Sequence, residues 1–369
     1  MKIDRHSALH VFAGWNTNRP ESLKSASGGT AWLLGKYYIE TLGGVVYATA
    51  FTAAKGACVI RATTLQDLEA TKGSRYVRSA FPQEMFEALL EDLAAGRPVL
   101  FVGTPCQVAG VRGKVEKRFP VKPGMTGERG MAGEKGMTGA KGLLCVDLLC
   151  HGAPPRSYLE AEIRHLIGDK PYTDIRFRGN DGHDFHLSIW DGEHCLYSVE
   201  ARKQPYLLAM LRGVNLMEGC YKCPFATPER VGDITLGDYI GLGAKDGFKV
   251  EGHNVSYIGI NTPQGESAYR AFCSANSAFQ SVERPVGERL AYRPSILEPT
   301  LRHPLRDAFR QRLPHLGCPR SIRRTMRGEI LHETPLYRTL HHWAHILLRH
   351  RHTLDGEVPG KNPPKGAEP

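Results

Sequence analysis

Short apolar stretches separated by glycine or proline recur along the first 262 residues of the chain. They are rich in valine, isoleucine, leucine and aromatic residues, and most are five to nine positions long, the length of a buried strand. We predict seven strands from them, at residues 43–52, 57–63, 97–105, 142–150, 185–192, 233–241 and 254–262.

Between several of these runs the apolar positions change to helical spacing. Apolar residues fall at i, i+3, i+4 and i+7 in residues 30–42, 82–96 and 155–168, and residues 105–119 and 265–279 are also helix-like. Alternation of this kind predicts an α/β fold, with a mixed sheet covered by helices.

The pattern changes after residue 262, where arginine and proline become frequent. We expect an irregular, helical and basic C-terminal extension there, with a disordered end. Residues 336–350 predict a basic amphipathic helix, which could pack on the domain, form an oligomer contact or lie on a membrane surface. The domain organisation that we expect comprises residues 1–20 as a leader, 21–97 and 98–262 as the two parts of the α/β unit, and 263–369 as the extension.

Residues 124–142 carry a glycine at every third position, in seven consecutive placements. Strict Gly-X-Y spacing is the signature of the collagen triple helix. The run is short, however, and its flanks predict a helix and a strand of one compact domain. We therefore expect a solvent-exposed loop inserted into that domain, with a trimerising element as the alternative.

The composition, 41% hydrophobic with nine cysteines and no apolar run long enough to span a membrane, indicates a globular protein. The start of the chain lacks a secretory signal, so we expect a reducing cytoplasm, where clustered cysteines bind metals or carry out redox chemistry. Residues 284–351 hold 14 arginines, no lysine and five acidic residues, which accounts for most of the net charge of +10. This basic segment is either a solvated tail or a surface for an acidic partner, a nucleic acid or an anionic membrane.

Four cysteines stand where predicted strands give way to loops or in a tight pair. Cys106 follows the third predicted strand, Cys150 ends the fourth, and Cys220 and Cys223 form the one Cys-x-x-Cys of the chain. Since strand ends in α/β sheets converge on one edge, these thiols could meet there. A set of four thiolates fits a [4Fe–4S] cluster or a tetrahedral zinc ion, and one pair with two dispersed single residues favours the cluster. Ordinary thiols are the third reading, and the one we expect for Cys58, Cys145, Cys195, Cys273 and Cys318.

Two glycine-containing loops could bind an anion. In "SASGG", Ser27, Gly28 and Gly29 precede a predicted helix, whose first N–H groups are free to bind phosphate. In "KGSRY", residues 73–76 could contact a phosphate and stack on a ring. A simple serine cap and an exposed turn explain the two loops equally well.

Taken together, "LKSASGGT", "GGVVYATAF", "KGSRYVRS", "VLFVGTPCQVAGV", "VDLLCHGAP" and "GCYKCPFATPERVGDITLGDYIGL" resemble the β-subunit family of coenzyme F420 hydrogenases and dehydrogenases. The resemblance extends from about residue 20 to 310. It implies FAD beside a [4Fe–4S] cluster, with a flavin-binding part at 21–97 and an iron–sulfur part at 98–262. It also implies an electron-carrier protein such as a ferredoxin as partner, and coenzyme F420 or NAD(P)H as a further candidate electron donor.

The family motifs imply ligands for both groups. The cluster would be held by Cys106, Cys150, Cys220 and Cys223, and the flavin would contact Ser27, Gly28, Gly29, Gly73, Ser74 and Arg75. Family members commonly have lysine in place of Arg75, and many carry a cysteine-rich ferredoxin-like segment that residues 1–20 lack.

The function that we expect is a cytoplasmic oxidoreductase that couples hydride transfer at FAD to one-electron transfer through the cluster. Because bacterial relatives occur beside surface-polysaccharide genes, a sugar-related or lipid-linked small molecule is a candidate substrate. The alternative is a zinc-stabilised binding module whose basic tail contacts nucleic acid or membrane, although we do not expect nucleic acid as the partner. The sequence assigns no catalytic acid or base, and we expect Asp233 and Asp238 to stabilise loops near the cluster.

Overall fold

The computed structural model describes residues 7–52, 55–119, 142–179, 185–289, 291 and 298–333. Three of the predicted segments lie outside the described residues. They are the Gly-X-Y run apart from its last glycine, the predicted helix at 336–350 and the C-terminal end.

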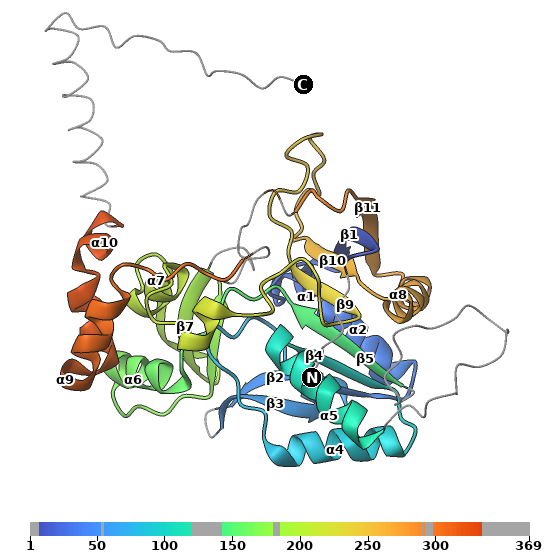
Figure 1. The fold of residues 1–369 in the computed structure, drawn as a ribbon, viewed down its shortest axis with the longest axis horizontal. Helices are drawn as coiled ribbons and strands as arrows, with labels where there is room; N and C mark the ends of the chain where they lie inside the picture. Colours follow the sequence, from blue (N-terminus) through green and yellow to red (C-terminus); the bar gives the residue numbers. More distant parts are fainter. Residues whose placement is uncertain are drawn as a thin grey trace, which may run out of the picture.

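An eight-stranded mixed sheet forms the centre of the molecule (Figure 1). Its strand order is β11-β1-β10-β9-β5-β4-β2-β3, and β2, β4, β5 and β9 are mutually parallel. The strands are β1 (His10–Asn16), β2 (Val45–Thr52), β3 (Gly56–Ala62), β4 (Val99–Gly103), β5 (Leu143–Leu148), β9 (Ile234–Asp238), β10 (Ser256–Ile260) and β11 (Phe279–Arg284).

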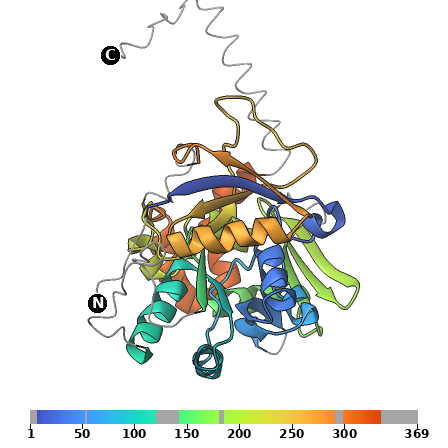
Figure 2. The same cartoon turned by 90° about the vertical axis from the view of Figure 1, so that its right-hand side faces the viewer.

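Helices cover both faces of this sheet. On one face, α2 (Thr30–Glu40) and α8 (Pro263–Ala275) bury their apolar sides against the central strands. On the other face, α4 (Gln83–Ala94) and α5 (Pro105–Arg118) do the same. In the view turned by 90°, α8 lies over the part of the sheet that contains β1 and β10 (Figure 2). The prediction of a mixed sheet covered by helices is confirmed.

A smaller unit adjoins the β2–β3 side of the large sheet. Its antiparallel sheet contains β6 (Asp174–Arg178), β7 (Phe185–Asp191) and β8 (His194–Glu200) in that order. The sheet packs on α6 (Arg156–Ile167) and α7 (Pro205–Leu211), and α7 in turn packs on α9 (Arg306–Thr325), which is followed by α10 (Arg327–His332). The shorter helices are α1 (Arg19–Leu23), α3 (Leu65–Glu69) and the 3-10 helix η1 (Glu218–Lys222).

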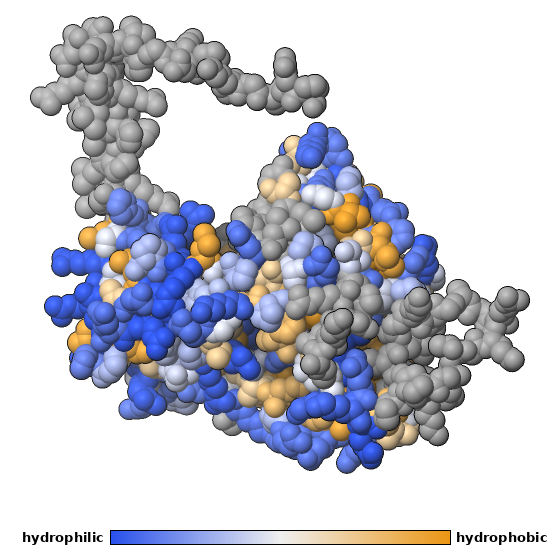
Figure 3. All heavy atoms as spheres, viewed as in Figure 1, coloured by the Kyte–Doolittle hydropathy of each residue, from blue (hydrophilic) through white to orange (hydrophobic). Residues whose placement is uncertain are grey.

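After β11, the C-terminal extension is helical and irregular within the described residues. Helix α9 contains Pro314 and Pro319, and Gly317 between them adopts a non-helical backbone with a φ of 69°. Proline removes a helical hydrogen bond, which explains the break. Hydrophilic side chains gather over the part of the surface that carries α9 and α10 (Figure 3).

All seven predicted strands are present in the structure, while β1, β6, β8 and β11 were not predicted. Strand β1 lies within the residues that we expected to be a leader, and the large sheet takes strands from all four predicted ranges. The division at residues 20, 97 and 262 stays a prediction.

No helix among the described residues has both the length and the apolar character needed to cross a membrane.

Candidate functional site

The carboxyl ends of β4 and β5 bring two of the four cysteines to one edge of the sheet. The two strands are parallel neighbours in which Gly103 pairs with Asp147. Cys106 lies in the first turn of α5, which begins directly after β4, and Cys150 follows the end of β5. The position of α5 is fixed at its start, where the Gln107 side chain accepts a hydrogen bond from the Thr104 N–H at 3.0 Å.

The Cys-x-x-Cys pair reaches the same place from η1. Cys220 lies in η1 and Cys223 directly follows it. The pKa of the Cys150 thiol is raised to about 12, first by burial and then by the other three thiols, which are close enough to act on it. Burial also raises the pKa of Cys220, with contributions from Cys223 and Cys106. The structure therefore brings the four predicted thiols together.

Backbone N–H groups point at two of these sulfurs. The Gly152 N–H donates to Cys150 Sγ at 3.4 Å, and the Ala153 N–H donates to Cys220, lowering its pKa. Gly152 has a φ of +104°, and a Cβ at this position would lie 2.8 Å from Leu216 Cδ1 and 3.1 Å from Cys220 Cβ. Glycine therefore lets the chain after Cys150 pass beside Cys220, where its N–H groups can stabilise thiolates.

The donor set fits an iron–sulfur cluster. Four cysteine thiolates are the usual ligands of a [4Fe–4S] cluster, which holds each on a different iron atom, whereas a zinc ion draws four ligands onto one atom. Among the described residues, no three His, Cys, Asp or Glu side chains are placed to hold a single metal ion. Thiols with raised pKa values release protons when a metal binds them, so metal binding here would depend on pH.

The five cysteines outside this set are distributed as the sequence predicts for core or incidental residues. Cys58, Cys145 and Cys318 are buried, Cys273 is half-buried and Cys195 is exposed.

The predicted flavin loop at 25–29 lies at the same edge of the sheet, beside the end of β1. The Ser27 hydroxyl donates to the Val255 carbonyl at 3.0 Å, and the Gly28 carbonyl accepts from the Asn16 N–H at 2.7 Å. Gly29, with a φ of 78°, is the residue before the first turn of α2. Since β1 and β5 are three strand spacings apart, this loop lies roughly 14 Å along the edge from the strand that leads to Cys150.

The second predicted loop, at 73–76, contains a half-buried cation. Arg75 donates to the carbonyls of Ser74 and Ala70, and its Nε is buried without a hydrogen-bond partner in the part of the chain that the structure describes. Burial lowers the pKa of this guanidinium. Gly73 has a φ of 81°, which lets the loop turn back toward Arg75. A half-buried guanidinium whose Nε is a spare donor fits an anionic ligand such as a dinucleotide phosphate.

Lys72 connects the two loops. Its Nζ lies 2.5 Å from Glu21 in α1, 2.7 Å from Glu69 in α3, and 3.9 Å from the centre of the Trp32 ring in α2. The loop at 73–76 is thereby held against the helix that follows the loop at 25–29.

Gly28 is predicted to be intolerant of any side chain. An added Cβ would lie 2.3 Å from the Gly14 carbonyl oxygen and 2.7 Å from the Ser256 nitrogen, and neither backbone atom can move freely. We expect Gly28→Ala to destabilise the protein by about 1–3 kcal/mol and to lower the urea midpoint of unfolding. The matched control is Gly110→Ala in α5, where a Cβ meets nothing within 4 Å and alanine should stabilise the helix. Equal midpoints for the two variants would contradict the packing that we describe.

Sequence reasoning missed the buried ion pair between Asp147 and Arg230. Asp147, fully buried in β5, accepts hydrogen bonds from the Arg230 side chain, the Val231 and Gly232 N–H groups and the Thr235 hydroxyl. The signal for it was a single acidic residue inside the otherwise apolar run "GLLCVDLLC", since a buried carboxylate requires a partner.

Of the two aspartates expected to stabilise loops near the cluster, only Asp238 lies at that edge of the sheet, because Asp233 precedes the first residue of β9, which runs parallel to β5. Asp233, also buried, contacts Arg112 at 2.8 Å and accepts from the Cys145 N–H at 2.8 Å. Asp238, at the end of β9, contacts Arg178 of the smaller unit at 2.8 Å.

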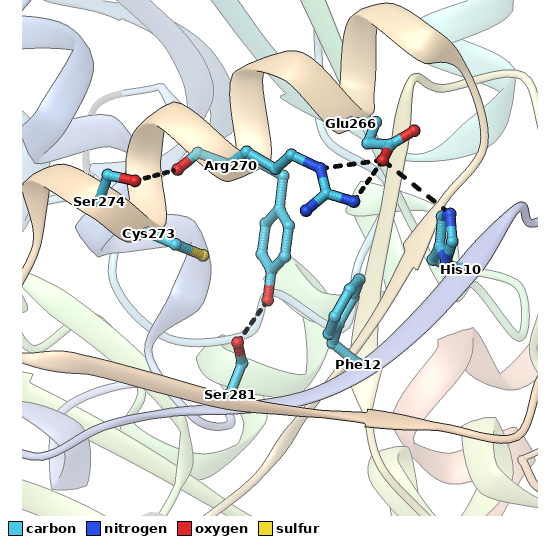
Figure 4. A pocket seen from close by; sticks show the side chains of 8 residues that line it. His10, Phe12, Glu266, Arg270, Cys273, Ser274 and Ser281 are labelled. Carbon is cyan, nitrogen blue, oxygen red and sulfur yellow. Dashed lines mark hydrogen bonds and ion pairs between the residues drawn. The ribbon is translucent and has the colours of Figure 1, made fainter.

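A separate hollow of about 410 Å³ lies between α8 and the strands β1 and β11 (Figure 4). Its charged groups are paired with one another, because Glu266 contacts Arg270 at 2.6 Å and His10 at 4.0 Å. His10 begins β1, so this end of the hollow lies at the edge of the sheet opposite the cysteines. The lining residues are His10, Phe12, Glu266, Tyr269, Arg270, Cys273, Ser274 and Ser281.

Comparisons with known proteins identify the family of the chain. Residues 96–283, just over half of the chain, match the family model for the C terminus of the coenzyme F420 hydrogenase/dehydrogenase beta subunit. That range contains all four clustered cysteines. Among solved structures, the chain is similar to one from the F420-reducing [NiFe] hydrogenase complex of Methanosarcina barkeri. The two share 17% sequence identity with a TM-score of 0.48, over 76% of this chain and 85% of that one. No curated protein matches the sequence.

Proposed function

Since the chain belongs to the coenzyme F420 hydrogenase/dehydrogenase β-subunit family, a family of oxidoreductases, we propose that it transfers electrons between FAD and a partner through a [4Fe–4S] cluster. The observation that supports the proposal is the convergence of the four cysteines. The parallel neighbours β4 and β5 end beside each other before Cys106 and Cys150, and a Cβ on Gly152 would lie 3.1 Å from Cys220 Cβ, in the pair with Cys223. When bound, FAD exchanges hydride equivalents and the cluster exchanges single electrons, so the pair couples the two kinds of carrier.

The residues of the chain bind and orient these groups. Cys106, Cys150, Cys220 and Cys223 would hold the cluster, and the N–H groups of Gly152 and Ala153 would stabilise thiolate charge and influence the reduction potential.

The flavin proposal rests on the two loops joined by Lys72. Ser27, Gly28 and Gly29 hold the chain against β1 and β10, and Arg75 offers a buried, unpartnered donor to an anion. Gly73 and Ser74 shape the loop around that guanidinium. Both loops and the thiols adjoin the carboxyl ends of the parallel strands, where α/β sheets bind their ligands.

Several finer elements of the function belong to this proposal. The candidate hydride donors are coenzyme F420 and NAD(P)H, the candidate electron carrier is a ferredoxin, and the candidate substrate is a sugar-related or lipid-linked molecule. Each donor can be tested by mixing it anaerobically with the purified protein and following the bleaching of flavin absorbance.

Anaerobic purification with metal and flavin analysis tests the proposal directly. We expect a brown protein with about four iron and four sulfide ions per chain and FAD released on denaturation. A colourless protein that contains about one zinc ion and no flavin would instead establish the zinc-stabilised binding module.

A further inference from the structure

One face of the thiol site is open to solvent. Cys106 is exposed, whereas Cys150, Cys220 and Cys223 are half-buried. Gly110 lies one helical turn beyond Cys106, and a Cβ added there would meet nothing within 4 Å. The thiols are therefore accessible from the start of α5.

The second glycine of this face precedes Cys220 in η1. Gly219 is exposed, and a Cβ added to it would also meet nothing within 4 Å. Since neither Gly110 nor Gly219 carries a side chain, a partner could approach the backbone closely at both places.

Positive charge surrounds η1. Lys222, between the two cysteines of the pair, is exposed. Arg78 is exposed as well and contacts Sδ of Met217, the residue before η1, at 3.7 Å. We call the surface formed by Cys106, Gly110, Gly219, Arg78 and Lys222 the basic face.

Three arginines extend this charge along the start of α9. Arg302, Arg306 and Arg310 all contact Glu218, the first residue of η1, and Arg302 also contacts Asp307. Three guanidinium groups that contact only two carboxylates leave a net positive charge. Arg78 and Lys222 add to this charge.

We propose that the basic face is the docking surface for an acidic one-electron carrier protein. This inference rests on the proposed function, because it takes the four thiols as ligands of the cluster. A carrier must come close to the cluster, and the face gives access at the exposed ligand. Acidic carriers would be steered there by complementary charge, which raises the association rate at low salt. Interfaces of redox carriers are small and transient, so a few exposed cations have a large influence.

These cations could also offset the negative charge of the thiolates that bind the cluster. Burial and contacts distinguish a cation with that structural role from one that is available to a partner. Arg306 is buried and donates to the Val214 carbonyl at 2.8 Å, as a structural cation does. Arg78 and Lys222 are exposed and are held by no ion pair among the described contacts. Their replacement should therefore affect a partner more than the fold.

The experiment measures binding of an oxidised plant-type [2Fe–2S] ferredoxin, an acidic carrier, to the purified full-length protein by anaerobic calorimetry. We expect binding at about 0.05 M salt that weakens about fivefold or more at 0.3 M salt. Arg78→Glu and Lys222→Glu should each raise Kd about tenfold at low salt while iron content stays unchanged. A basic c-type cytochrome should not bind.

Lys117→Glu is the matched control. It makes the same charge reversal on the helix that carries Cys106, at an exposed position 11 residues and about 16 Å further along. Its Kd should equal that of the wild type.

Several outcomes would overturn the docking surface. Iron-loaded protein that does not bind the ferredoxin, or that loses affinity equally in all three variants, removes it and leaves the proposed function intact. Tighter binding of a short DNA duplex, abolished by Arg78→Glu, would make the face a nucleic-acid site instead. An iron-free preparation that still binds the ferredoxin through Arg78 and Lys222 would support the surface and reject the proposed function.

Discussion

Replacing Cys150 by serine is expected to remove most of the iron from the purified protein. Its side chain is half-buried beside the other three thiols, and its sulfur accepts a hydrogen bond from the Gly152 N–H. Serine at this position remains a neutral hydroxyl at neutral pH and is a poor iron ligand compared with a thiolate. We expect iron and sulfide per chain to fall about tenfold, with loss of the broad visible absorbance, after anaerobic purification.

The controls are Cys58→Ser and Cys273→Ser. Cys58 is buried in β3 and Cys273 lies in α8 beside the separate hollow, so both are outside the thiol cluster. Iron content should match the wild type in these two variants, whereas Cys106→Ser, Cys220→Ser and Cys223→Ser should behave like Cys150→Ser. Full iron content in the Cys150 variant, with an unchanged spectrum, would show that the cluster is held elsewhere.

The strands that the sequence predicted are those whose apolar runs are long or continuous. Strands β4 and β5 are buried on both faces by helices, so their side chains are almost all apolar. Strands β8 and β11 lie at sheet edges and are largely exposed or half-buried, so their sequences "HCLYSVE" and "FQSVER" lack such a run. In β1 a glycine interrupts the pattern, because Gly14 packs against Ile258 and Phe279.

For the candidate site, the sequence indicated which thiols to consider and the edge at which two of them meet. It could not indicate what surrounds them, because those contacts come from distant parts of the chain. Gly28 illustrates the difference. Its flexibility suggested a ligand loop, but its nearest neighbours are backbone atoms of Gly14 and Ser256, 14 and 228 positions away. The contact of Gly152 with Cys220 is equally invisible before the chain folds.

Arg230→Met is expected to destabilise the protein by about 3–5 kcal/mol, because it leaves the Asp147 carboxylate buried without its counter-charge. The Arg230 side chain also donates to the carbonyls of Leu148, Phe225 and Thr227. These contacts span the gap between the strand that leads to Cys150 and the loop that follows Cys223. Loss of Arg230 should therefore loosen the thiol cluster as well as the fold.

Thermal unfolding and iron content, measured on the same preparation, separate these two effects. The control Arg270→Met removes an exposed partner of Glu266 in α8 and should change the stability by less than about 0.5 kcal/mol without loss of iron. If Arg230→Met does not fold, Arg230→Lys serves in its place, since lysine retains the charge but cannot reach Asp147 and the three carbonyls at once. Wild-type stability and iron content in the lysine variant would show that charge alone is needed. Wild-type values in the methionine variant would show that the pair does not position the thiols, whereas partial iron loss from a folded protein would show that it does.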